Sequence, residues 1–340
     1  MIEEIEYAPV IVTACYRYRA FVNCIESLEK NLWAKYTDIY VAIDYPRNEA
    51  DISEFRKIVE YAEDNIKAFA KKEVIVRERN YGYVDNFQGV INYVFQKYES
   101  IIYTEDDNIF SPCFIEYMDK CLARFKENKR ISAISGFSRL QWPGANNIYI
   151  DTGISFWGMG IWKDRWEMLD SMLTVPSFQK LADNSYNLKN IYRHSKRRFE
   201  KFINMYVIRE YIIKHDSAYG CVADALDMYR ICPVKSLVQN VGMFEEKAEH
   251  VWNDTGRKLC GEIEISEKEH FEIEINEDIL DDKYAEKYID VAFSNKKIAV
   301  RTMVYAGLIA VIGCKRTIKL WKWGGKVSGF LEKFERRNRK

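Results

Sequence analysis

The chain has 340 residues, of which 48% are hydrophobic and 14% aromatic, so it can bury one large core or two smaller ones. Lys plus Arg equals Asp plus Glu at 51 each, so no overall positive field favours a nucleic-acid partner. The eight cysteines form no CxxC pair, which predicts reduced thiols rather than disulfides or a zinc site. The acidic amino-terminal stretch does not resemble a signal peptide, so we expect a cytoplasmic protein.

Strand and helix patterns alternate through the first third of the chain. Short apolar runs predict buried strands at residues 10–14, 38–44, 73–79 and 100–107. Apolar residues at helical spacing predict helices at residues 21–32, 52–72 and 83–98. This alternation predicts an α/β fold with a mostly parallel sheet and helices on both of its faces. Ligands of such sheets bind beyond the carboxyl ends of the strands.

The remainder of the chain is less regular. We expect a strand over 130–138, a turn followed by a helix over 154–169, a helix interrupted near His215 over 208–231, and a strand followed by a loop over 233–243. Residues 251–297 are rich in acids, and we expect a lid or a surface extension there.

The last segment, residues 298–340, separates charge from the rest of the chain. Its apolar run at 303–314 is 12 residues long, whereas a membrane-spanning helix needs about 20. From Lys315 onward, ten basic residues face two acids, which gives a net charge of +8, and tryptophans are interleaved with the basic residues. This pattern is typical of a helix on an anionic membrane surface. The alternative is a helix docked on its own domain with its charges in water.

Three consecutive acids, Glu105, Asp106 and Asp107, end the fourth predicted strand. Their repulsion is costly unless a positive charge lies beside them. Carboxylates bind Mg²⁺ or Mn²⁺ and leave positions on the ion for phosphate oxygens. Strand alternation predicts Glu105 and Asp107 on one face and Asp106 on the other. The alternative is a helix N-terminus, because the following residues continue into a predicted helix.

At this point the sequence resembles a family. The segment "YTEDDNIFSPCFIEYMDKCL" resembles the metal-binding segment of GT-A-fold glycosyltransferases, and particularly those of bacterial surface-polysaccharide transferases and N-acetylglucosaminyltransferase I. Five further segments resemble family motifs in the same order: "PVIVTACYRYRAFVNCIESLEKN", "VAIDYPR", "RNYGYVDNFQGV", "SFWGMGIWKDRWEML" and "PVKSLVQNVGM". The resemblance implies a Rossmann-like GT-A catalytic domain over 1–250, with a nucleotide-binding half (1–110) and an acceptor half (111–250).

The resemblance also assigns roles to residues. Asp107 would bind Mn²⁺ or Mg²⁺, Glu105 would face the donor sugar, and Asp106 would face ribose or sugar hydroxyls. Asp44 would accept a hydrogen bond from uracil, which favours a UDP-sugar, although an acid at this position also suits a strand-end turn cap. The other implied nucleotide-binding residues are Ala14, Tyr16, Arg17, Asn80 and Gly82. For Arg17, an ordinary surface position is the alternative.

Three more residues carry implied ligand contacts. Trp157 and Gly158 would line the donor sugar, and core packing is the alternative for the tryptophan. His250 would lie near the diphosphate or the metal, or else on the ordinary surface.

An inverting transferase also needs a carboxylate that takes the proton of the acceptor hydroxyl. The resemblance places this base at Asp216, with Asp224 in reserve. The tryptophan that usually accompanies the base is absent, since His215 and Ser217 flank Asp216. Asp216 and Ser217 also fit a helix N-cap.

Together these features predict a metal-dependent, inverting glycosyltransferase. It would move a sugar from a nucleotide-sugar to a hydroxyl of a glycan or lipid-linked glycan in surface-polysaccharide synthesis, at the inner face of the cell membrane. One alternative is a nucleotidyltransferase acting on sugar phosphates, although residues 14–21 lack the glycines usual in its first loop. The other is a nucleotide- or glycan-binding protein without turnover.

Overall fold

The structure is a computed structural model that describes residues 6–138, 146–203, 212, 214–242 and 263–275, with isolated positions between 304 and 320. His250 and most of the basic segment lie outside the described residues.

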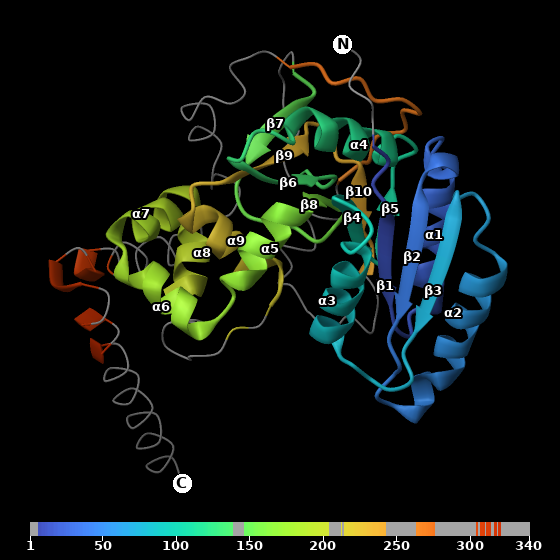
Figure 1. Ribbon diagram of the computed structural model, residues 1–340, viewed down its shortest axis with the longest axis horizontal. Helices are drawn as coiled ribbons and strands as arrows, with labels where there is room; N and C mark the ends of the chain where they lie inside the picture. Colours follow the sequence, from blue (N-terminus) through green and yellow to red (C-terminus); the bar gives the residue numbers. More distant parts are fainter. Residues whose placement is uncertain are drawn as a thin grey trace, which may run out of the picture.

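A mixed sheet of eight strands forms the centre of the described part, in the order β3-β2-β1-β4-β8-β6-β9-β7 (Figure 1). Strands β1 to β4 are parallel, and β6 and β9 run in the same direction, because β4 and β6 both pair antiparallel with β8. The predicted α/β fold with a mostly parallel sheet is therefore confirmed. The strands are β1 (Val10–Ala14), β2 (Asp38–Ile43), β3 (Lys71–Val76), β4 (Ser100–Glu105), β6 (Ile131–Ser135), β7 (Ile148–Asp151), β8 (Met159–Trp162) and β9 (Tyr229–Pro233).

Helices cover both faces of this sheet. Successive strand residues point to opposite sides, so neighbouring residues of one strand pack with different helices. Val10 and Val12 pack with helices α1, α2 and α4, whereas Ile11 between them packs with α3 and with α5 to α9. Figure 1 shows α5 to α9 gathered on one side of the sheet and α1 and α2 on the other. The helices are α1 (Tyr18–Glu29), α2 (Ile52–Asp64), α3 (Tyr83–Val94), α4 (Phe114–Phe125), α5 (Lys163–Ser171), α6 (Val175–Asp183), α7 (Ser185–His194), α8 (Lys196–Lys201) and α9 (Asp216–Ala225).

Several helices and strands differ from the predicted ones in their bounds or type, because pairing between strands decides them there rather than the local sequence pattern. The strand predicted to 107 ends at Glu105, so Asp106 and Asp107 lie in a turn. The next residues form β5 (Asn108–Phe110), which pairs antiparallel with β10 (Val238–Asn240), where a helix start was the alternative. The turn predicted before α5 is the buried strand β8. Helix α9 ends at Ala225 rather than near 231, because the chain turns through Asp227 at φ 58° and enters β9.

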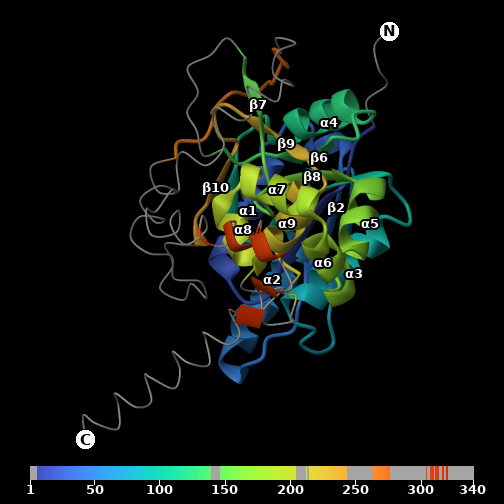
Figure 2. The ribbon, with the colours of Figure 1, turned by 90° about the vertical axis from the view of Figure 1, so that its left-hand side faces the viewer.

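The described part of the acid-rich region, residues 263–275, is an extended segment along the outside of the domain (Figure 2). Its backbone bonds to residues before β10 and before β7: the Ser266 amide donates to the Ser236 carbonyl, and the Glu274 amide donates to Asn147 Oδ1. Lys120 of α4 donates to the carbonyl of Phe271 at 2.8 Å. This segment is therefore joined to the sheet domain by hydrogen bonds.

Candidate active site at the carboxyl edge of the sheet

The carboxyl ends of β1, β2 and β4 bring several of the predicted site residues to one edge of the sheet. Thr13 of β1 pairs with Glu105 of β4, and the Asp44 amide donates to the Ala14 carbonyl at 2.8 Å. Gly158, just before the antiparallel β8, also lies at this edge, where its carbonyl accepts from the Gly136 amide at 2.8 Å. Loops that follow β1, β2, β4 and β6 and the loop that precedes β8 thus meet at this edge.

Arg17 supplies the positive charge beside the acid triplet. It lies in the turn between β1 and α1, next to the half-buried Tyr16. Its Nη1 donates to Asp107 Oδ2 at 2.7 Å, and its Nη2 contacts Asp106. Burial acts to lower the pKa of Arg17, but the charges of Asp106 and Asp107 raise it above its ordinary value. The expectation that Asp106 and Asp107 would point to opposite faces is therefore wrong, because the turn after Glu105 directs both acids to one guanidinium.

Glu105 behaves differently from its two neighbours. Burial, followed by the charge of Asp107, raises the pKa of the Glu105 carboxyl to about 8. The charge of Asp216 acts in the same direction, whereas Tyr83 and Arg17 act to lower it. Burial and the neighbouring charge thus favour the protonated form of Glu105, and Arg17 pairs with Asp106 and Asp107.

Residues after β10 hold Asp107 in place. Asn240 Nδ2 donates to Asp107 Oδ1 at 2.8 Å, and the Val241 amide donates to the Asp107 carbonyl at 2.8 Å. At Gly242, a Cβ atom would stand 2.1 Å from Asp107 Oδ2, so only glycine fits there. Sequence reasoning missed the roles of Asn240 and Gly242, although both lie in the "QNVG" stretch of a segment that resembles the family.

The side chains of this turn can be compared with the ligands that a divalent cation needs. Within the described part of the chain, no three His, Cys, Asp or Glu side chains gather as a metal site. Mg²⁺, however, commonly binds through one or two carboxylates, with water and substrate phosphates filling its other positions. Asp106 and Asp107 are two such carboxylates, close enough to share one guanidinium. The residues present therefore fit a cation shared with a diphosphate.

Both oxygens of the Asp44 carboxylate already accept hydrogen bonds from other residues of the chain. Oδ1 accepts from the amides of Tyr45 at 3.0 Å and Tyr81 at 2.8 Å. Oδ2 accepts from the Gly82 amide at 2.9 Å and from Asn80 Nδ2 at 3.2 Å. A carboxylate has about four lone-pair positions, so none remains for a nucleobase. The structure gives Asp44 the turn-capping role that the sequence allowed, with Asn80 and Gly82 as its partners.

Trp157 and Gly158 are also held by packing. Gly158 has φ 65°, and a Cβ there would come within 2.8 Å of Val238 and 2.9 Å of Phe114. The half-buried Trp157 packs edge-on against Phe137, with ring centroids 4.9 Å apart. Both residues therefore have a packing reason to be present that is independent of a sugar.

The two candidate bases lie in contrasting places. Asp216 begins α9, and its side chain is 50% exposed, with Oδ1 3.6 Å from His215 Nδ1. Partial burial acts to raise the pKa of Asp216, but His215 and Lys201 outweigh it and lower the pKa below its ordinary value. Asp224 is completely buried and paired with Arg198 and His194, so an acceptor hydroxyl has no access to it.

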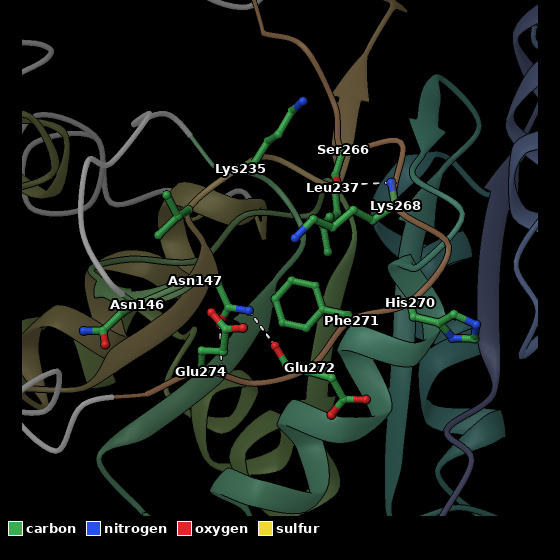
Figure 3. A pocket seen from close by; sticks show the side chains of 11 residues that line it. Asn146, Asn147, Lys235, Leu237, Ser266, Lys268, His270, Phe271, Glu272 and Glu274 are labelled. Atoms are coloured by element: carbon green, nitrogen blue, oxygen red, sulfur yellow. Dashed lines mark hydrogen bonds between the residues drawn. The ribbon is translucent and has the colours of Figure 1, made fainter.

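A pocket of about 430 Å³ lies at the same edge, beyond the end of β9 (Figure 3). Its wall combines the Phe271 ring with Lys268 from the extended segment and with Asn146 and Asn147 before β7. Asn147 Oδ1 accepts from the Glu274 amide at 2.9 Å, which fixes the amide at the wall. Amides, ammonium groups and an aromatic ring around one hollow are suited to polyhydroxylated ligands.

Comparisons with known proteins leave the family open. No family model matches the chain, and no curated protein sequence matches it. Among solved structures, the mannosyltransferase PcManGT from Pyrobaculum calidifontis in complex with GDP-Man and Mn²⁺ superposes at a TM-score of 0.36 and 13% identity, over 66% of this chain and 73% of that one.

Residues 1–349 of S. aureus TarS superpose at a TM-score of 0.33 and 11% identity, over 64% of this chain and 70% of that one. A longer TarS structure gives 0.27 and 17%, over 36% of this chain and only 20% of that one. Such distant likenesses say nothing about activity. The features that point to a functional site in this protein are the strand order of its sheet and the turn that holds Asp106 and Asp107 at the carboxyl edge.

Proposed function

We propose that this chain is a metal-dependent glycosyltransferase of the GT-A type, which moves a sugar from a nucleotide-sugar to a hydroxyl of a glycan or lipid-linked glycan. One observation carries the proposal: Asp106 and Asp107 lie in a turn at the carboxyl edge of a mostly parallel sheet, and both pair with an arginine whose side chain reaches solvent. Ligands of such sheets bind at this edge.

In this proposal, Asp107 and Asp106 hold Mn²⁺ or Mg²⁺, which when bound offsets the negative charge of the departing diphosphate. Asn240 and the Val241 amide keep Asp107 in one orientation. Arg17, at the start of α1, binds the diphosphate oxygens from the β1–α1 turn.

Asp216 acts as the general base. Its lowered pKa keeps it ionised at neutral pH, and its charge acts on Glu105 of the acid triplet. The acceptor oxygen bonds to the anomeric carbon while the bond from that carbon to the diphosphate oxygen breaks, and the acceptor proton passes to Asp216. This displacement inverts the configuration of the anomeric carbon.

Weaker features support the choice of the nucleobase in the nucleotide-sugar and of the acceptor. Because the oxygens of Asp44 are filled, a preference for UDP over GDP stays a prediction from the family resemblance. The pocket beyond β9 supports a glycan acceptor, since it combines the amides of Asn146 and Asn147, in the predicted acceptor half, with the Phe271 ring of the predicted lid or extension.

We also propose that the basic carboxy-terminal segment binds an anionic membrane surface, where a lipid-linked acceptor would be found. The described positions between 304 and 320 are mostly helical, and Val304, Val311 and Leu320 expose 55%, 83% and 52% of their surface. No described helix has the length and apolar character needed to cross a bilayer. Full-length protein should sediment with vesicles containing anionic lipid and not with neutral vesicles, and salt should weaken this binding.

The nucleotide site is tested by calorimetry with UDP and GDP, with and without Mn²⁺. We expect binding of at least one nucleotide to require Mn²⁺ and to be lost in Asp107→Ala. The matched control is Asp64→Ala, which removes an exposed acid at the end of α2 and should leave binding unchanged. Metal-independent binding, or no binding of either nucleotide, would contradict the proposal. Turnover of nucleotide-sugars then separates a transferase from a binding protein, and turnover of a nucleoside triphosphate with a sugar phosphate would indicate the nucleotidyltransferase.

A further inference from the structure

Arg17 pairs with both Asp106 and Asp107 and is the most exposed of these three side chains. The Arg17 side chain is 29% exposed, whereas those of Asp106 and Asp107 are 4% and 12% exposed. Asp107 Oδ1 accepts from Asn240 and Oδ2 accepts from Arg17, so both of its oxygens have partners in the free protein. A metal ion that binds Oδ2 while the guanidinium stays in place would lie beside its positive charge, which repels the ion.

A guanidinium and a divalent cation compete for these two carboxylates. Both carry positive charge, and at contact distance they repel each other. Arg17 pairs with two carboxylates through charge-assisted hydrogen bonds, which are among the stronger hydrogen bonds in proteins. A metal ion arriving alone must break them, and the freed guanidinium gains only water in return.

A nucleoside diphosphate changes this balance, because phosphate oxygens accept the same forked hydrogen bonds as carboxylates. Arg17 can leave the acids without losing its charged partners when a diphosphate comes with the metal. Its backbone lies at the N-terminus of α1 in the β1–α1 turn, so only the side chain needs to move.

We infer that Arg17 is an internal counter-ion that closes the acid pair in the free protein and exchanges the acids for the diphosphate when the metal and nucleotide bind together. This inference rests on the proposed metal and nucleotide site. It predicts that metal and nucleotide bind with positive coupling, each strengthening the other, because the arginine is released only when both are present.

The test is Mn²⁺ binding measured from the loss of the free-ion signal in electron paramagnetic resonance, on metal-free full-length protein. Arg17→Gln keeps much of the side-chain length and removes the charge. We expect it to bind Mn²⁺ alone about 10-fold or more tightly than the native protein, the scale of a lost charge-assisted contact. Its nucleotide affinity should fall, and the coupling between Mn²⁺ and nucleotide should shrink by a similar factor.

Two controls keep the result interpretable. Arg19→Gln removes an exposed cation two residues away in α1 and should change neither quantity. Arg17→Lys keeps a charge without the fork, and we expect Mn²⁺ affinity between those of the native protein and Arg17→Gln. If Arg17→Gln misfolds, which far-ultraviolet circular dichroism would reveal, the lysine variant alone decides the outcome.

Unchanged affinity for Mn²⁺ alone in the Arg17 variants, beside Mn²⁺-dependent nucleotide binding in the native protein, would overturn the counter-ion role and leave the proposed function standing. If the native protein and all variants fail to bind Mn²⁺ even with nucleotide, both the function and this inference fail.

Discussion

Two of the described clusters that combine acids with an arginine differ in how far the arginine reaches solvent. In the edge cluster, Arg17 bridges two acids in a turn and remains 29% exposed. In the helix cluster, Asp224 and His194 have no exposed side-chain surface, and Arg198 is 13% exposed. The edge cluster, which comprises Arg17, Glu105, Asp106 and Asp107, thus keeps its arginine in contact with solvent. The helix cluster, which comprises His194, Arg198 and Asp224, is a buried network.

The largest expected effect is on turnover. Asp216→Asn should lower the transfer rate by about 10² to 10⁴, since it removes the group that takes the acceptor proton. Nucleotide affinity should stay close to native, because Asp216 does not contact the acid pair through any hydrogen bond among those described. Initial rates of nucleoside diphosphate release, measured with an acceptor that supports turnover, check this. A rate within a few-fold of native would assign the base elsewhere.

Stability should distinguish the two clusters most clearly. Asp224→Ala removes the completely buried partner of Arg198 and should lower the free energy of unfolding by about 3–5 kcal/mol. Asp107→Ala should cost about 2 kcal/mol or less in metal-free protein, because Arg17 can turn toward water when its partner is lost. Urea unfolding of both variants measures the difference. Equal losses would break the comparison and make the edge cluster another structural network.

A smaller effect is expected at Asp44. Asp44→Asn replaces one accepting oxygen with a donor amide, which leaves either the Tyr81 or the Gly82 backbone amide without its acceptor. The free energy of unfolding should fall by about 1–3 kcal/mol. The ratio of UDP to GDP affinity should stay unchanged. A selective loss of UDP binding would restore the nucleobase contact predicted by the family resemblance.

The smallest effect concerns an acid with no arginine. Asp119 is fully buried, its Oδ1 accepts from the Ala8 amide at 3.0 Å, and among the described residues its Oδ2 has no hydrogen-bond partner. Burial raises the pKa of Asp119 well above its ordinary value. The folded state therefore holds a proton that the unfolded chain releases, so this residue makes stability fall as pH rises above about 4.

Asp119→Asn should flatten that pH dependence, by at most about 1.4 kcal/mol per pH unit within the titration range. Denaturant unfolding at pH 5 and pH 8 compares the variant with the native protein. A native slope that survives in the variant would assign the pH dependence to other groups.

Sequence reasoning found what local pattern determines. The strands at 10–14 and 100–107 and the acids at the end of the latter could be predicted, because apolar runs and adjacent charges are visible along the chain. The pairing of Arg17 with Asp107, 90 residues apart, depends on β1 lying beside β4. The support from Asn240 depends on β10 pairing with β5. Such contacts arise from topology, which periodicity does not reveal.

The filled oxygens of Asp44 show a different limit. The sequence offered both a nucleobase contact and a turn cap, and the choice depended on the path of residues 80–82. Likewise, Asp216 and Asp224 lie on one short helix, yet one side chain is half exposed and the other is completely buried. Exposure is a property of the packed helices, so sequence alone ranked these two acids by resemblance.

The most direct test of the central claim, that the edge cluster is a metal and diphosphate site, is a crystal structure grown with Mn²⁺ and the nucleoside diphosphate that binds more tightly. Anomalous scattering from manganese should give a peak within bonding distance of Asp107, with the Arg17 guanidinium moved onto the diphosphate. A cluster unchanged from the free protein, with Arg17 still on both acids and the manganese peak elsewhere or absent, would contradict the account.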